Sequence, residues 1–317
     1  MARAVVCVVF ALVLAAPVRA NAEAVLLLAE PFGRAGSIYP TGHMSVYLPR
    51  VCADSPSRLR RCTRGETGVV IGRYHKVHGA DWFAIPLIPY LYAVERAEDI
   101  PASVDPATVL ALRDAYRRAH LRSVIPDGPS GDVPKGDWYQ LLGAAYDRRF
   151  VGFGVRTTTE QDDRLIEALN ASPNTPRFNL LFRNCADFAS DILNFYFPKS
   201  VRSNWVSDLG FTTPKQVARS LVKHALRRPE LELSVFVVPQ VPGSRPTSRK
   251  ARGILESLLK SKKYAIPLGV VQPWMPWVPT GIAAGYLVTG RFDANQYVMT
   301  TYTPEALEAQ ARQLSTE

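Results

Sequence analysis

The residue best placed to do chemistry is a cysteine in the second half of the chain. It lies in Asn184-Cys185-Ala186-Asp187-Phe188, which joins a strand-like run over 177–183 to an amphipathic helix pattern over 184–196. A thiol in the first turn of a helix faces unpaired backbone N–H groups and the positive end of the helix dipole, and both favour the nucleophilic thiolate. A small buried apolar side chain is the commonest role of a free cysteine. The local pattern supports these two interpretations equally.

A cysteine nucleophile requires a base, and histidine is the usual one. The sequence contains five histidines. His120 and His224 lie near the ends of helix patterns rich in Arg and Lys, where a solvent-exposed or capping role is expected. His43 follows Gly42, which permits close backbone approach, and it begins an alternating strand pattern over 43–48. His43 is therefore the predicted base.

A second strand pattern, over 68–77, carries the polar groups that would orient this base. If it pairs antiparallel with the strand that His43 begins, its end lies beside the start of that strand. His43 would then neighbour the segment from Tyr74 to His78. We predict His75 as the third polar residue, with His78 or Tyr74 as alternatives, because a third group commonly orients the catalytic base.

The N-terminal 22 residues have the order of a secretory signal peptide. Met1 to Arg3 is a short positive start, 4–16 is an uncharged apolar run, and small residues follow, with cleavage after Ala20 or Ala22. The apolar run is too short for a comfortable membrane span, and an uncleaved anchor is the alternative. We therefore predict an exported protein, periplasmic or extracellular, whose formal net charge falls from +10 to +8 on cleavage.

Three cysteines remain after cleavage. Cys52 and Cys62 bracket a polar loop and are predicted to form a disulfide in an oxidising compartment. Cys185 is then left over, either as a reactive thiol or as half of an intermolecular disulfide. The sequence has no CxxC pair and no cluster of Cys and His with zinc-ligand spacing, so we expect no metal and no cofactor.

The remaining patterns mix helices and strands, which indicates an α+β fold. Further strands are expected over 25–28, 146–156 and 231–238, and further helices over 105–120, from 159, over 213–226 and from 303. The apolar run over 82–94 contains two prolines and is expected to be irregular or strand-like. The length suits one large domain, or a core with an extension.

An uncharged segment over 264–290 follows a lysine cluster at 260–263. Together with Trp274 and Trp277, these lysines fit docking on an anionic membrane surface, a partner that the positive net charge also suits. Four prolines argue against a spanning helix. The alternative, which we favour, is a strand and loop packed on the core. No nucleic-acid-binding module is recognisable, and we expect no nucleic-acid partner.

The order of these motifs resembles a known superfamily. A Gly-His strand comes early, a strand with polar residues follows, and Asn-Cys-x-x-Phe begins a helix. In this order the chain is similar to the circularly permuted branch of the papain-like NlpC-type superfamily, which includes lecithin:retinol acyltransferase-like proteins and uncharacterised bacterial exported families. The resemblance covers residues 25–200, and its closest match is FNLLFRNCADF over 178–188.

The resemblance implies a permuted papain-like core over 23–210, with an antiparallel sheet and a nucleophile-bearing helix. An α/β C-terminal extension over 211–317 follows, as a lid or a membrane-facing part. In such a core Cys185 is the nucleophile, His43 the general base and His75 the third residue.

Two features depart from the family pattern. The loop after the His strand is long and holds Cys52 and Cys62. Ala186-Asp187 stands where the acyltransferase members often have an acidic residue and a histidine. Asn184 fits either a helix cap or part of an oxyanion site.

These observations predict an exported thiol hydrolase, of amidase or peptidase type, or an acyltransferase. Cys185 would attack an amide, ester or thioester carbonyl, and His43 would transfer the proton while an acyl-enzyme forms. Export favours a peptide, cell-wall or lipid substrate in the cell envelope. The alternative is a non-catalytic envelope binding or scaffolding module on the same fold, with a thiol of ordinary reactivity.

Overall fold

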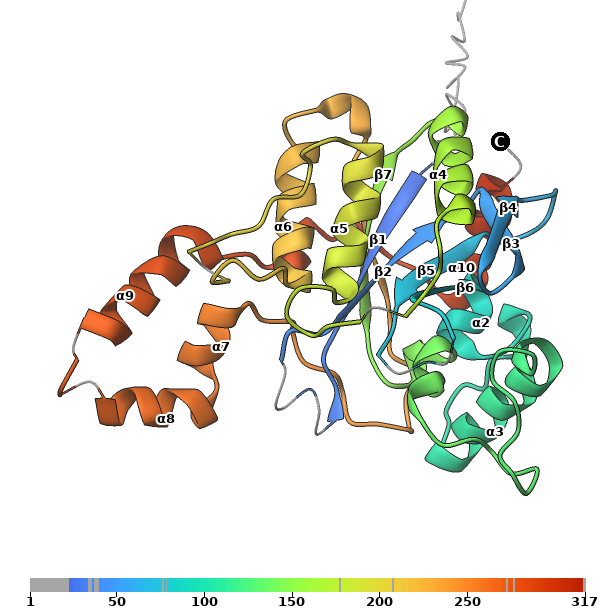
Figure 1. The fold of residues 1–317 in the computed structure, drawn as a ribbon, viewed down its shortest axis with the longest axis horizontal. Helices are drawn as coiled ribbons and strands as arrows, with labels where there is room; N and C mark the ends of the chain where they lie inside the picture. Colours follow the sequence, from blue (N-terminus) through green and yellow to red (C-terminus); the bar gives the residue numbers. More distant parts are fainter. Residues whose placement is uncertain are drawn as a thin grey trace, which may run out of the picture.

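The computed structural model describes residues 23–33, 36, 40–75, 77, 79–176, 178–206, 208–271, 273–275 and 277–315. The predicted signal peptide, residues 1–22, lies outside the described residues, and so does His78. The described chain forms a mixed α+β fold around a largely antiparallel sheet (Figure 1), as the sequence predicts at this level.

A seven-stranded sheet, in the order β6-β5-β2-β1-β7-β8-β9, runs through the centre of the fold. Its strands span Glu23–Ala29 (β1), His43–Leu48 (β2), Val69–Arg73 (β5), Trp82–Pro86 (β6), Phe150–Arg156 (β7), Ser234–Val238 (β8) and Thr300–Thr301 (β9). All neighbouring strands pair antiparallel except β8 and β9. The strands predicted over 25–28, 43–48, 68–77, 146–156 and 231–238 are present as β1, β2, β5, β7 and β8.

Helices cover both faces of this sheet (Figure 1). They span Leu87–Tyr92 (α2), Pro106–Tyr116 (α3), Thr159–Ala171 (α4), Cys185–Tyr196 (α5), Pro214–Ala225 (α6), Ile254–Lys260 (α7), Lys262–Val271 (α8), Trp277–Gly285 (α9) and Pro304–Leu314 (α10). α5 and α6 pack on the face that carries Met44 and Val46. α2, α3 and α10 belong to the core on the opposite face, with Tyr47. Successive strand residues therefore serve two separate cores, as strand geometry requires.

Side-chain caps explain where five of the helices begin. In each, the residue before the helix accepts a hydrogen bond from a backbone N–H of the first turn, which has no partner within the helix. The caps are Asp105 for α3, Thr158 for α4, Asn184 for α5, Thr213 for α6 and Thr303 for α10. The helix starts predicted from the sequence are thus confirmed.

Two of the predicted segments differ in the structure. The run over 82–94 forms β6 and then the short helix α2, in which all six residues are buried and no amphipathic period exists to reveal a helix. Residues 178–183 form a turn, closed by a bridge between Asn179 and Arg183, and no strand.

The uncharged segment over 264–290 contains the helices α8 and α9, so the strand-and-loop interpretation is wrong. Pro273 lies between these two helices, and Pro279 lies in the first turn of α9, where a missing N–H costs nothing. None of the helices in the described ranges is both long and apolar enough to cross a membrane.

Residues 211–317, the expected C-terminal extension, are joined to the rest of the fold through the sheet and both helical layers. They supply α6 to one layer, β8 and β9 to the sheet, and α10 to the other layer. Only α7, α8 and α9 project from this body, as an arm at one side of the molecule (Figure 1).

The polar loop that follows β2 is a hairpin of β3 (Val51–Ser55) and β4 (Arg58–Arg61), closed by a disulfide between Cys52 and Cys62. Glu66 lies close enough to the two sulfurs to suggest a metal site. The sulfurs are bonded to each other, and Glu66 accepts hydrogen bonds from Arg60 at 2.7 Å. The hairpin is therefore held by covalent and ionic contacts of its own.

Replacing both cysteines, Cys52→Ser with Cys62→Ser, is expected to lower the free energy of unfolding by roughly 2–4 kcal/mol, because the unfolded chain regains the freedom of the closed loop. Urea unfolding followed by circular dichroism measures the change. The unsubstituted protein in reductant should match the double variant, and reductant should leave the variant unchanged. An unaltered unfolding midpoint would show that the hairpin does not depend on the bridge.

Candidate active site

The start of α5 is fixed by its cap. Asn184 Oδ1 accepts hydrogen bonds from the N–H groups of Ala186 at 2.7 Å and Asp187 at 3.1 Å, and the Asp187 carboxylate accepts one from the Asn184 N–H at 3.0 Å. Asn184 Nδ2 donates to the carbonyls of Leu180 and Thr212. Both the oxygen and the nitrogen of the Asn184 amide are thus hydrogen-bonded within the protein, which favours the capping role over an oxyanion role.

Cys185 is the first residue of α5 and is only partly accessible to solvent. Its sulfur lies within hydrogen-bonding reach of the Met44 backbone N–H, near the start of β2. α5 packs along β2, so this contact is part of the main interface between the helix and the sheet. The fold therefore brings the thiol to the residue that follows His43.

His43 begins β2, and the glycine before it is required by the local geometry. Gly42 has a φ of +77°, and a Cβ there would lie 2.3 Å from the Ala29 carbonyl oxygen. The His43 ring stacks on Tyr74, with 5.1 Å between ring centroids and 30° between the planes. His43 Nε2 is buried and has no hydrogen-bond partner among the described residues. No hydrogen bond joins it to Cys185 in this part of the chain.

Tyr74, and not His75, lies against the His43 ring. β2 and β5 pair antiparallel with Val46 opposite Ile71, and continuing this register places His43 opposite Tyr74. His75 is half-exposed, with Nδ1 3.5 Å from the Asp137 carboxylate and its ring near Phe178. The predicted antiparallel pairing of the two strands is confirmed. The residue that it places beside His43 is Tyr74, one of the two alternatives to His75.

A buried arginine, Arg148, was not among the residues that the sequence pattern marks for chemistry. Its guanidinium lies 4.5 Å from the centre of the Phe32 ring, and its Nε has no hydrogen-bond partner in the described ranges. Its charge acts on both Cys185 and His43. Only its position in the sequence could have indicated it: Arg148 lies two residues before β7, whose partner β1 also pairs with the strand of His43.

The hydroxyl groups of two tyrosines also lie near Cys185 and His43. Ser45 Oγ and the Tyr90 hydroxyl are hydrogen-bonded at 3.1 Å, fully buried. The Tyr74 hydroxyl is buried without a hydrogen-bond partner of good geometry in the described part. Burial raises the pKa of both phenols, so both stay protonated at neutral pH.

Burial also decides the protonation state of the pair. It raises the pKa of Cys185 to about 11, although the Met44 N–H and the Arg148 charge act in the opposite direction. Burial, and then the charge of Arg148, lowers the pKa of His43 to about 3. The resting site therefore holds a neutral thiol beside a neutral imidazole. The expected thiolate is outweighed by the cost of burying a charge.

Comparison with known proteins gives no family: no protein-family model, curated protein or solved structure matches the chain. The arrangement of Cys185, His43, Tyr74 and Arg148 is therefore the basis for inferring the function.

Alkylation of Cys185 by iodoacetamide is expected to be slow at neutral pH and to accelerate towards pH 11, because only the thiolate reacts. A thiol pKa raised by two units leaves roughly 100-fold less thiolate at pH 8 than an ordinary cysteine has. Arg148→Met removes a cation that favours the thiolate, so it should slow alkylation further. Peptide mass mapping across the pH range measures both effects.

Arg245→Met is the matched control, because Arg245 also lies over the Phe32 ring, at 5.8 Å, but does not act on the pKa of Cys185. It should leave the profile unchanged. Fast labelling of the unsubstituted protein near pH 6 would contradict the neutral pair and show a resting thiolate.

Asn184→Ala removes the cap of α5 and is expected to lower the free energy of unfolding by about 1–2 kcal/mol. It should also alter the pH profile of Cys185 alkylation, because the first turn would no longer be fixed. Thr303→Ala, which removes the single cap bond of α10, should lower stability without changing that profile. Equal alkylation profiles for both variants would show that the cap does not position the thiol.

Proposed function

We propose that this protein is an exported cysteine hydrolase or acyltransferase with a permuted papain-like arrangement. Cys185 is the nucleophile and His43 the general base. The observation that carries the proposal is the buried Nε2 of His43, which has no hydrogen-bond partner among the described residues. The backbone N–H of the next residue, Met44, acts on the Cys185 thiol and lowers its pKa. Buried polar atoms are almost always hydrogen-bonded, and the exceptions call for an explanation, such as a catalytic role.

The neutral pair favours a proton transfer that accompanies attack. As the sulfur bonds to the substrate carbonyl carbon, His43 Nε2 takes the thiol proton and the carbonyl π electrons move to oxygen. Collapse of this intermediate breaks the bond to the amine, alcohol or thiol, which leaves with the proton from the imidazolium. Water then hydrolyses the acyl-enzyme, or an amine or alcohol accepts the acyl group.

The developing negative charge requires donors that are already in place. The Met44 backbone N–H favours negative charge on the sulfur, and the buried Arg148 guanidinium supplies a fixed positive charge that acts on the same atom. Arg148 costs free energy in the resting protein because its charge is buried without a carboxylate hydrogen-bonded to it in the described chain. An oxyanion at this site would supply the missing counter-charge.

Tyr74 takes the orienting position in this proposal. Its ring stacks on His43 and limits the rotation of the imidazole, whereas the half-exposed His75 lies against Asp137 and Phe178. Tyr74 acts through His43 and is a positioning residue. The substrate is proposed to be an acyl group of the cell envelope, in a peptide, a cell-wall component or a lipid, on the strength of the N-terminal signal and the net positive charge.

The rival proposal is a non-catalytic envelope binding module on the same fold. It is favoured by the raised pKa of Cys185 and by the lack of a hydrogen bond between Cys185 and His43 in the described structure. Trapping of the acyl-enzyme distinguishes the two proposals.

Incubation with p-nitrophenyl esters and acyl thioesters of increasing chain length, followed by acid quenching, is expected to add one acyl group to Cys185. Intact-protein and peptide mass spectrometry measure it. Cys185→Ala should abolish the adduct, and His43→Gln should slow its formation by roughly 100-fold or more, the usual contribution of a general base. His120→Ala, which alters a half-exposed histidine paired with Glu95, is the control.

Tyr74→Phe keeps the stacked ring and should retain most of the rate, whereas Tyr74→Ala should shift the pH dependence as well as the rate. His75→Ala decides between the two candidates for the third position, and a loss equal to that of Tyr74→Ala would restore His75. Absence of any acyl adduct, with alkylation unaffected by His43→Gln, would favour the binding module.

A further inference from the structure

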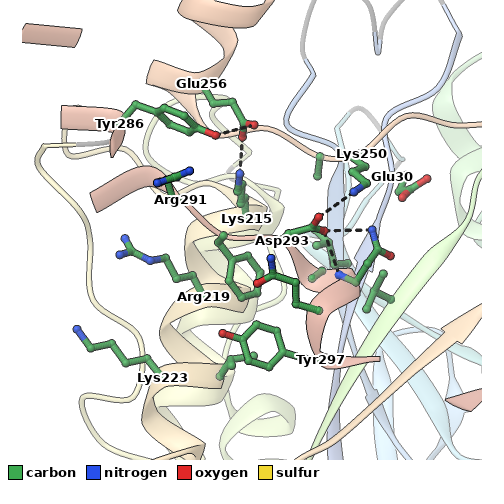
Figure 2. A pocket seen from close by; sticks show the side chains of 18 of the residues that line it. Glu30, Lys215, Arg219, Lys223, Lys250, Glu256, Tyr286, Arg291, Asp293 and Tyr297 are labelled. Carbon is green, nitrogen blue, oxygen red and sulfur yellow. Dashed lines mark hydrogen bonds and ion pairs between the residues drawn. The ribbon is translucent and has the colours of Figure 1, made fainter. Parts of the chain in front are cut away.

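A large pocket lies away from the thiol. It has a volume of about 770 Å³ and is bounded by α6, by α7 and by the chain that returns from the arm (Figure 2). Neither Cys185 nor His43 lines it. Its function is therefore separate from the proposed thiol chemistry.

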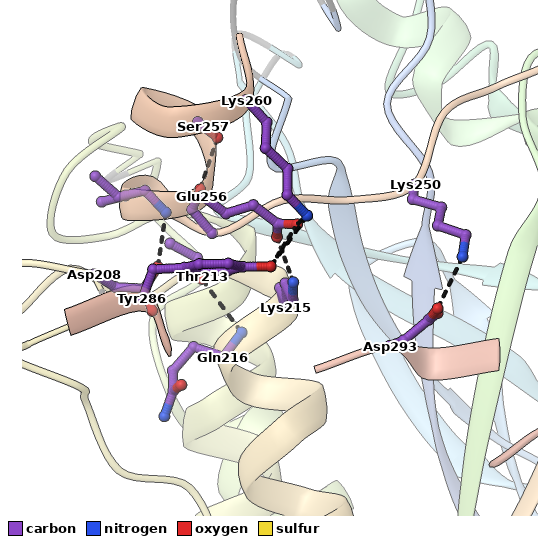
Figure 3. A network of polar contacts seen from close by, with 12 residues as sticks. Asp208, Thr213, Lys215, Gln216, Lys250, Glu256, Ser257, Lys260, Tyr286 and Asp293 are labelled. Carbon is purple, nitrogen blue, oxygen red and sulfur yellow. Dashed lines mark hydrogen bonds and ion pairs between the residues drawn. The ribbon is translucent and has the colours of Figure 1, made fainter. Parts of the chain in front are cut away.

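The walls of this pocket are strongly cationic: eight cationic and three acidic side chains line it. All three carboxylates are already neutralised. Glu30 is paired with Arg149 at 2.9 Å and Asp293 with Lys250 at 2.8 Å. Glu256 lies between Lys215 and Lys260 and also meets the Tyr286 hydroxyl (Figure 3).

Four cations remain without a counter-charge. Arg219 and Lys223 lie four residues apart on α6, and Arg227 follows in the turn after this helix. Arg291 comes from the returning chain, and Figure 2 shows it with Arg219 and Lys223. None of the four side chains has an ion pair or a hydrogen bond within the described ranges. Like charges four residues apart on a helix repel each other, and a bound anion would remove this cost. The pocket is therefore suited to an anionic ligand.

The arm beside the pocket is apolar and uncovered. It carries no charge from Tyr264 to Gly290, and Trp274 and Trp277 are 84% and 71% exposed. Ile266 and Val270 of α8 are exposed as well. Trp277 begins α9, and Trp274 lies in the turn between α8 and α9. Exposed tryptophans on and between helices that are too short to span a bilayer are typical of segments that lie in a membrane interface.

The arm and the pocket form one continuous surface. Glu256 and Lys260, which line the pocket, belong to α7, where the chain enters the arm. Tyr286 and Arg291, which also line it, follow α9, where the chain leaves the arm. Cationic groups thus stand at the base of an apolar projection. A bilayer with anionic headgroups offers both partners at one surface: negative charge for the cationic pocket and an apolar interior for the arm.

We propose that the pocket binds the phosphate headgroup of an anionic phospholipid while α8 and α9 lie in the interface of the same bilayer. Arg219, Lys223, Arg227 and Arg291 supply the charge, and Trp274 and Trp277 supply the apolar anchor. The proposal does not depend on the thiol, so Cys185→Ser should bind vesicles as the unsubstituted protein does.

Co-sedimentation of the mature chain with vesicles tests the proposal. Vesicles containing phosphatidylglycerol should bind the protein, and vesicles of phosphatidylcholine alone should not. Raising the salt from about 0.1 M to about 1 M shortens the Debye length from about 10 Å to about 3 Å and should weaken binding. The triple variant Arg219→Gln, Lys223→Gln, Arg227→Gln should lower the partition coefficient on the order of 100-fold.

The control for charge is the triple variant Arg58→Gln, Arg64→Gln, Lys135→Gln. It removes the same number of exposed cations at positions that do not line the pocket, and it should bind as the unsubstituted protein does. Trp274→Ser with Trp277→Ser should weaken binding and abolish the blue shift of tryptophan fluorescence on anionic vesicles.

Equal binding of the two triple variants would overturn the headgroup site. Unchanged binding and an unchanged blue shift in the tryptophan variant would overturn the role of the arm. Binding of inorganic tripolyphosphate without binding of vesicles would overturn the docking proposal and assign the pocket to a soluble polyphosphate.

Discussion

The pairing of β1 with strands on both of its sides is the constraint on which the candidate site depends. Ala29, the last residue of β1, lies opposite His43 of β2 and also opposite Phe150 of β7. This register brings the start of β2 and the arginines before β7 to the same end of the sheet. α5 then packs along β2 with its N-terminus at that end, so the thiol, the imidazole and the Arg148 guanidinium converge, although His43 is more than 100 residues from both Arg148 and Cys185 in the sequence.

The site also shows two electrostatic effects in opposition. The N-terminus of α5, the Met44 N–H and Arg148 all favour a negative sulfur, and each is strongest where water is excluded. The same exclusion of water penalises the thiolate and the imidazolium, and this penalty is the larger one. A pair that is neutral at rest gains from these preorganised groups only as charge develops, which is the condition for stabilising a transition state over the ground state.

The pocket beside α6 differs from the thiol site in that several of its charged groups are exposed cations. The helix buries Val217, Leu221 and Val222 against the sheet, and its other face carries cations into the pocket. Those near its N-terminus are paired, since Lys215 meets Glu256, whereas those further along have no counter-charge in the described ranges. The arm, which carries no charge from Tyr264 to Gly290, joins this same pocket at both of its ends. The cationic pocket and the exposed apolar helices α8 and α9 therefore form a single surface, independent of the thiol.

Local chemistry in the sequence determined much of the framework. The caps Asp105, Thr158, Asn184, Thr213 and Thr303 set helix starts through hydrogen bonds within a few residues, and the alternation over 43–48 set the bounds of β2. Tertiary structure alone decided that Tyr74 contacts His43, that Arg148 reaches the thiol, that 264–290 contains exposed helices, and that the resting pair is neutral. These four features depend on strand register and on burial, and both arise from contacts between segments that are distant in the sequence. A helix cap or a strand period, by contrast, is complete within one short stretch of chain.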